Sequence, residues 1–148
     1  MIQRIQTVFI LLAIISLGLF LYLPLITLEV DGNKFVEHIP GWDVSIFKEG
    51  YFYYVNAVFA GTAIGLGLIS IFLYKRTGLQ QLFCWFTIFF IIAAEAFVFY
   101  RYQTRMFPGD VVLRKWNILA AFALVFEILA VVYIRKDEDK LKSLDRLR

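Results

Sequence analysis

Two glutamates stand inside long apolar runs of the sequence, and they are the residues best placed to do chemistry. Glu95 lies in the run 81–100 and Glu127 in the run 116–134. An ionised carboxylate near the centre of a bilayer costs about 2.5 to 3.5 kcal/mol on insertion scales. Each glutamate is therefore expected to be protonated, or to face protein or water.

The depths of the two glutamates predict different polar partners. With a rise of about 1.5 Å per residue, Glu95 and Asn56 both lie roughly 8 to 9 Å below the outer ends of their runs. A hydrogen bond between them is therefore expected. Glu127 lies roughly 10 Å from the inner end of its run, a depth close to that of Thr87 and Ser16. Two separate polar contacts are predicted, rather than one carboxylate pair.

Three roles for these acids follow from their chemistry. Glu127 shares a row of four-and-three spacing with Ala120 and Val131, so its side chain should face the bundle interior. As protonated or hydrogen-bonded groups, the acids would fix helix packing. As titrating groups, they would relay a proton or bind a ligand. In a contact with a partner subunit, each would meet a basic or hydroxyl group.

Other reactive side chains are scarce. The sequence contains one cysteine, Cys84, and one histidine, His38. An intrachain disulfide and a cysteine-based zinc cluster are therefore excluded, as are bis-histidine haem and ordinary histidine metal sites. A serine–histidine constellation and a phosphate-binding glycine loop are also missing. We therefore predict no catalytic residue, no metal, no cofactor and no nucleic-acid partner.

The composition is typical of a membrane protein. Hydrophobic residues make up 61% of the 148 residues and charged residues 18%, whereas soluble domains are about 45 to 50% apolar and 25% charged. A helix of about 20 largely apolar residues crosses the hydrocarbon core. Four such runs occur, at about 5–28, 51–74, 81–100 and 116–134. The sequence predicts an all-α membrane protein, a four-transmembrane-helix bundle that forms a single domain over 1–148.

The distribution of positive charge predicts that both termini are cytoplasmic. Lys and Arg near short loops resist translocation across the membrane. In this orientation the loops 29–50 and 101–115 lie outside and the tail 135–148 lies inside. The cytoplasmic side as a whole then holds nine of the 15 basic residues, and the outer side holds six. The basic residues then on the cytoplasmic side are Arg4, Lys75, Arg76, Arg135, Lys136, Lys140, Lys142, Arg146 and Arg148. The turn after the second run is expected to contain Gly78.

The first outer loop has the pattern of a β-hairpin. An Asp31-Gly32 turn signal separates 27–30 from 34–37, two short segments that favour strands. The segment 42–47 alternates apolar and polar residues, so a third strand would stabilise the hairpin. We therefore expect a small extracytoplasmic β-hairpin or three-stranded element between the first two helices.

Basic residues gather in the second outer loop, and leucines recur in the tail. The basic residues of the loop are Arg101, Arg105, Arg114 and Lys115. These side chains either anchor the helix ends at the interface by snorkelling or bind an anionic lipid or ligand. In the tail, Leu141, Leu144 and Leu147 would share one side of a helix. The tail either lies on the anionic leaflet or a partner, or is a solvated helix end.

Small residues in the second run predict a helix-packing face. One row at four-and-three spacing consists of Asn56, Ala60, Ala63, Gly67 and Ser70. A second row beside it consists of Ala57, Gly61 and Gly65, of which the glycines form a Gly-x-x-x-Gly motif. Small residues let helix backbones approach closely in a membrane. We expect the second helix to be central and to touch at least two neighbours, with a homodimer face as the alternative.

The first residues resemble the start of a known family. Met1-Ile2-Gln3-Arg4-Ile5-Gln6-Thr7-Val8 leads directly into Phe9-Ile10-Leu11-Leu12-Ala13. This opening is similar to that of small four-span membrane proteins of Bacteroidota, catalogued as the domain-of-unknown-function family 4293. Length and number of spans are similar over the whole chain. The resemblance implies a bacterial inner-membrane location, but no assigned activity and no site residue.

Three functions are compatible with these features. The first is a non-catalytic structural or accessory subunit of a bacterial inner-membrane protein assembly. The second is a small oligomeric transporter or lipid-handling protein that uses Glu95 or Glu127. The third is a membrane enzyme acting on a lipid, which only the basic outer loop suggests. The expected partners are membrane lipids, together with another membrane protein or a second copy of the chain.

Overall fold

Four long helices dominate the computed structural model. It describes residues 3–30, 33–38, 53–103, 110–113 and 115–146. The helices are α1 (Gln3–Tyr22), α2 (Tyr53–Phe72), α3 (Thr77–Gln103) and α4 (Ile118–Arg146), with a short 3-10 helix η1 (Lys115–Asn117) before α4. All four α-helices are long and apolar enough to cross a membrane. The prediction of a helical protein with four candidate membrane spans is therefore confirmed by the length and composition of the helices.

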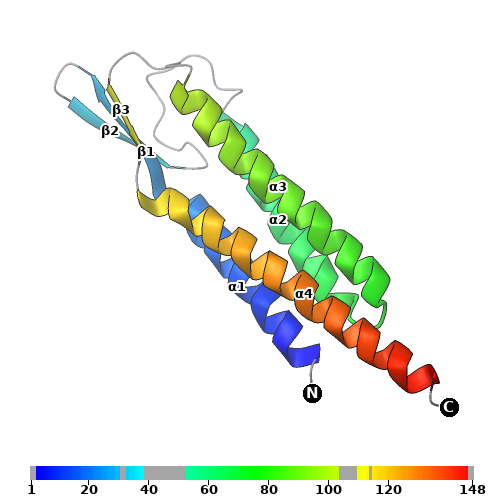
Figure 1. Ribbon diagram of the computed structural model, residues 1–148. Helices are drawn as coiled ribbons and strands as arrows, with labels where there is room; N and C mark the ends of the chain where they lie inside the picture. The colour runs from blue at the N-terminus through cyan, green and yellow to red at the C-terminus, as the bar shows by residue number, and fades with distance from the viewer. Residues whose placement is uncertain (1–2, 31–32, 39–52, 104–109, 114, 147–148) are drawn as a thin grey trace.

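The helices form a bundle in which each one is antiparallel to its neighbours. α1 packs most extensively on α4, and α2 on α3, while α3–α4 and α1–α2 contacts close the ring. Both termini therefore lie at one end of the bundle, as Figure 1 shows. We call this the basal end, and the opposite one the sheet end. The second helix does touch two neighbours, as predicted, but it is not more central than the others, because every helix in this ring has two main neighbours.

The first helix is shorter than the apolar run that predicted it. The run 5–28 contains no charge, but α1 ends at Tyr22 and strand β1 begins at Pro24. Proline has no backbone N–H and disfavours the helical conformation of the residue before it. The amide of Leu23 still donates to the carbonyl of Leu19 (2.8 Å), which completes the last turn.

The third and fourth helices extend beyond the others. α1 and α2 have 20 residues each, or about 30 Å, whereas α3 has 27 and α4 has 29. The turn between α2 and α3 is tight, and the carbonyl of Arg76 accepts a hydrogen bond from the amide of Gln80 (2.9 Å). Gly78 therefore lies in the first turn of α3 and not in the connection where it was expected. At the basal end, α4 continues through most of the predicted tail 135–148 as one unbroken helix.

A small sheet joins the two connections at the sheet end. β1 (Pro24–Val30) lies between β2 (Asn33–His38) and β3 (Asp110–Leu113), and both pairings are antiparallel. Thr27 is opposite Val36 on one side and Val112 on the other. The segments 27–30 and 34–37 of the expected hairpin fall within β1 and β2. The third strand expected at 42–47 lies outside the described residues.

The bundle interior is filled largely by small side chains. Toward the sheet end the buried cluster contains Ala13, Leu17, Phe20, Ala60, Ala63, Ile91, Val98, Ala120 and Ala123. Toward the basal end it contains Ile10, Cys84, Ile88, Ala130, Val131 and Ile134. Alanines allow close contact between helices, which matters in a membrane because lipid is as apolar as the interior. Large side chains such as Phe72, Phe89 and Ile15 are exposed instead, as expected for a surface that faces lipid.

Candidate functional site

Polar side chains are buried along the whole bundle axis. In the described part of the chain, those that are less than a tenth exposed are Gln6, Ser16, Asn56, Ser70, Gln80, Thr87 and Glu127. A polar group inside a membrane protein needs an internal hydrogen-bond partner, because hydrocarbon offers none. The groups that lack such a partner are therefore the first candidates for a functional site.

Glu127 lies where all four helices meet. Its side chain is 0% exposed, and α4 carries it in a buried row with Ala120, Ala130 and Ile134. The residue is eight positions before Arg135, so it lies about 12 Å inside the basal part of α4. Neither of its carboxyl oxygens has a hydrogen-bond partner among the described residues. A fully buried carboxyl without a partner is the most unusual group in the bundle.

Gly67 on α2 makes room for this carboxyl. A Cβ atom added at Gly67 would lie 3.7 Å from Oε1 of Glu127 and 3.2 Å from Cγ1 of Ile14 on α1. The glycine therefore lets α2 approach the side chains of both α1 and α4. Any larger residue at this position would need the neighbouring side chains to move.

Cys84 and Ser70 complete the surroundings of the carboxyl. Cys84, a free and fully buried cysteine of α3, lies beside Glu127. Its thiol donates to the hydroxyl of Ser70 on α2 at 3.8 Å, and that hydroxyl donates to the carbonyl of Gly67 at 2.9 Å. The thiol thus donates its one proton to Ser70 and the hydroxyl donates its own to the backbone. Neither proton is given to the carboxyl oxygens of Glu127, although the thiol lies within hydrogen-bonding reach of them.

Gln80 provides a second unpartnered group, one turn closer to the basal end. It precedes Cys84 by four residues, so both side chains lie on the same face of α3. Gln80 is 1% exposed, and neither Oε1 nor Nε2 of its amide has a partner among the described residues. Glu127 and Gln80 therefore place four unsatisfied polar atoms in the basal half of the bundle.

The predicted partners of Glu127 are bonded elsewhere. Thr87 donates to the carbonyl of Phe83 (3.0 Å), and Ser16 donates to the carbonyl of Leu12 (2.9 Å). Both acceptors belong to the preceding turn of the same helix, which is a common arrangement for buried Ser and Thr. The expected hydrogen bonds from these hydroxyls to Glu127 are therefore absent.

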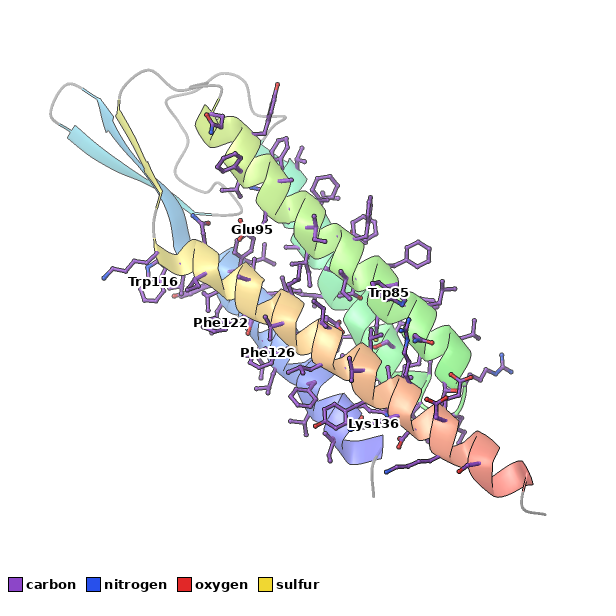
Figure 2. All side chains as sticks on the ribbon, viewed as in Figure 1. Trp85, Glu95, Trp116, Phe122, Phe126 and Lys136 are labelled. Atoms are coloured by element: carbon purple, nitrogen blue, oxygen red, sulfur yellow. The ribbon has the colours of Figure 1, made fainter. Side chains whose placement is uncertain are left out.

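Glu95 and Asn56 do not form the predicted hydrogen bond. Asn56 is 1% exposed, and its Oδ1 lacks a partner, as does Oε1 of Glu95. Figure 2 shows Glu95 pointing from α3 toward the beginning of α4. Glu95 follows Cys84 by 11 residues, or about 16 Å along α3, while Cys84 lies beside Glu127. The two glutamates thus occupy different depths and do not form one carboxylate pair.

The residues of the predicted packing face divide between two environments. Ala60, Ala63 and Gly67 are buried in the bundle. Ala57 and Gly65 are partly buried, and Gly61 is exposed. A Cβ atom added at Gly61 or Gly65 would meet no other atom within 4 Å. The Gly-x-x-x-Gly motif is therefore not used for packing within the bundle.

The structure brings together little of the predicted basic site. Lys115 is exposed in η1 at the sheet end, and Arg101 lies in α3. Arg105 and Arg114 lie outside the described residues. Trp116, next to Lys115 in η1, is also exposed just before α4 (Figure 2), which is a typical position for an aromatic residue at a membrane interface.

The chemistry available in the interior is that of carboxyl groups. No group of three or more His, Cys, Asp or Glu side chains able to hold a metal occurs among the residues described. A carboxyl can bind and release a proton, accept hydrogen bonds or meet a cation. An anion or a phosphate would find no described basic side chain near Glu127.

Comparison with known families identifies the family of the chain. Residues 2–147 match a family described as a domain of unknown function, DUF4293. The chain belongs to the DUF4293 family. Searches of curated proteins and of solved structures find no match. The resemblance seen in the opening residues is therefore confirmed, and it extends over nearly the whole chain.

Two polar residues of this DUF4293 protein were not singled out as sites by sequence reasoning. Gln6 on α1 donates from Nε2 to Oδ2 of Asp137 (2.6 Å) and to the carbonyl of Tyr133 (3.2 Å), both on α4. Gln80 was placed in a loop, because the third run was predicted to begin at 81. A signal for Gln80 exists, since it extends the four-and-three row of Cys84 and Thr87 toward the start of α3.

Proposed function

We propose that this DUF4293 protein is a non-catalytic accessory subunit of a bacterial inner-membrane assembly. The observation that supports this is the position of Gly61 and Gly65 on α2. Both face open space, although a Gly-x-x-x-Gly motif serves close contact between helices. A helix of a partner protein would use this face, and the partner is either another membrane protein or a second copy of this chain.

The proposed orientation places the basal end in the cytoplasm and the sheet end outside. Exposed basic residues at the basal end support it, since positive charge near short loops stays on the cytoplasmic side. These residues are Lys75, Arg76, Arg135, Lys136 and Lys140. The expected extracytoplasmic element between the first two helices would then be the pair β1 and β2. Strand β3, from the connection between α3 and α4, extends it to three strands.

The test is purification from native membranes in mild detergent, followed by identification of bound proteins. A stoichiometric partner is expected, and the double variant Gly61→Leu, Gly65→Leu should lose it because the added side chains block close approach. Gly18→Leu is a matched control, since Gly18 is an exposed glycine on α1 with equally open surroundings. Retention of the partner by the double variant, or its loss in the control, would contradict the proposal.

A small transporter or lipid-handling protein is the second candidate, and it would use Glu95 or Glu127. The unpartnered Oε1 of Glu95 and the two unpartnered carboxyl oxygens of Glu127 favour it. Four spans are few for a carrier, so this function would require an oligomer. A purified homo-oligomer that carries lipid and no other protein would support transport over the accessory role.

A further inference from the structure

The buried polar groups on the two sides of Glu127 are unequal. On the basal side lie Ser70, Cys84 and Gln80, all of them buried. On the sheet side the interior is filled by an apolar cluster that includes Leu17, Ile91 and several alanines. Ser16 and Thr87 are also buried near the carboxyl, but each donates to a carbonyl of its own helix, so the nearest unpartnered polar atoms are those of Gln80 on the basal side.

The unsatisfied atoms on the basal side call for a polar occupant. An unpaired polar group in an apolar environment costs several kcal/mol, and neither Glu127 nor Gln80 has a partner for its polar atoms among the described residues. Protonation of Glu127 removes the problem only in part: the neighbouring sulfur of Cys84 is a weak acceptor for its hydroxyl, and the amide of Gln80 still has no partner. Buried water typically makes about three hydrogen bonds to such groups. Water between the Gln80 amide and the Glu127 carboxyl would satisfy both.

The basal position of Gln80 connects this pair to the solvent. Gln80 lies in the first turn of α3, directly after the exposed residues Gly78 and Leu79, and its backbone N–H donates to the carbonyl of exposed Arg76. Water bonded to the side chain of Gln80 would therefore lie within a few ångströms of the end of the bundle. A hydrogen-bonded chain of this kind carries protons without moving the side chains far.

We propose that Glu127 is a proton-binding site served by internal water that enters from the basal end past Gln80. This goes beyond the accessory role and does not depend on a partner. Cys84 is the titratable group facing Glu127 from α3, while α1 and α2 face it with Ile14, Gly67 and Ser70. On α4 itself, the nearest described acid toward the basal end is Asp137, which is bonded to Gln6.

The experiment is infrared spectroscopy of the full-length protein in lipid vesicles. The difference between wild type and Glu127→Gln isolates the carbonyl band of the protonated Glu127, over a pH series from about 4 to 10 that brackets ordinary and raised carboxyl pKa values. Transfer to D2O should shift this band within minutes, because water reaches the group. The absence of a protonated band at every pH, or a band that resists exchange for hours, would overturn the proposal.

Two matched leucine variants, and a third variant that keeps the amide, test the route by which water reaches Glu127. Gln80→Leu should slow the exchange by about ten-fold or more, since one hydrogen-bonding partner is lost from the path. Asn56→Leu, an equally buried change near the sheet end, should leave the rate unchanged. An unchanged rate in Gln80→Leu, or a slowed one in Asn56→Leu, contradicts access from the basal end. Gln80→Asn keeps a side-chain amide, so the carboxyl proton of Glu127 should exchange nearly as fast in this variant as in wild type. This variant separates the loss of the polar group from a general effect of substitution on the fold.

Discussion

At the scale of single residues, Gly67 controls how closely α2 approaches Ile14 of α1, next to the carboxyl of Glu127. The same helix carries two other glycines, Gly61 and Gly65, and the surroundings of both are open. A glycine in the middle of a helix normally lowers stability by roughly 0.5 to 1 kcal/mol relative to alanine. At Gly67 this loss is offset by contacts that only a residue without a side chain allows.

The substitution Gly67→Leu is expected to destabilise the protein by about 1 to 3 kcal/mol, the usual range for overpacking a well-packed interior. Gly61→Leu should have little effect on the isolated protein, because its Cβ would meet open space. Unfolding in a denaturing detergent can be followed by the reaction of Cys84, which is buried and free, with a thiol reagent. Equal stability of the two variants would show that Gly67 is not a tight contact.

The local polar bonds were the part of the site least accessible to sequence reasoning. Depth arithmetic placed Glu95 and Asn56 at similar levels, but level alone does not fix the direction of a side chain around its helix. Ser16 and Thr87 were expected to bond to Glu127, yet each had a closer acceptor in the carbonyl of its own helix. Burial of Glu127, by contrast, followed from its four-and-three row, because helical period determines which face is inside.

At the scale of elements, one side chain joins the first and last helices. Gln6 is 3% exposed, and it bonds both the carboxylate of Asp137 and the backbone of α4. The rings of Phe9 and Tyr133 stack next to it, with centroids 5.3 Å apart. The basal end of α1 is therefore held to α4 by a polar and an aromatic contact together.

Removal of this contact should loosen the basal end. Gln6→Leu is expected to cost about 1 kcal/mol, because the partly buried carboxylate of Asp137 loses its donor. Asp137→Ala should have a similar effect, whereas Asp139→Ala, the same change at an exposed site of α4, should have almost none. Amide hydrogen exchange near Tyr133 should rise in the first two variants. Equal exchange in all three proteins would show that the bond contributes no stability.

The lengths of the elements show what the sequence specifies and what it does not. Long apolar runs, two of which contain a single glutamate, identified all four helices, because a backbone in hydrocarbon must bond within its own segment. Their ends were less accurate: α1 stops before Pro24, and α3 begins at Thr77, ahead of the predicted start. The pairing of β1 with β3 was not predicted, since it joins segments far apart in the sequence and no local pattern encodes such a contact.

At the scale of the whole molecule, both termini lie at the same end of the bundle (Figure 1). The basic residues are the basis of the proposal that this end faces the cytoplasm. The charge distribution is a property of short loops and is independent of how the helices pack. Topology and packing can therefore be tested separately.

Reporter fusions should place the basal end in the cytoplasm. A fluorescent protein fused to the C-terminus is expected to be bright, and alkaline phosphatase fused there is expected to be inactive, because its disulfides form only in an oxidising compartment. Fusions made after His38, at the end of β2, should give the reverse pattern. The opposite result at both positions would invert the proposed topology.

The unbroken course of α4 also has a mechanical meaning. From Glu127 to Arg146 the helix contains neither proline nor glycine, the residues at which helices usually bend, and this segment is about 28 Å long. A straight helix of this kind is a lever arm: torque applied at its free end reaches the carboxyl without being absorbed by a hinge. A rotation of the protruding end of α4 would therefore turn Glu127 relative to Gly67 and Cys84 in the same direction, against the contacts of Tyr133 and Asp137 with α1.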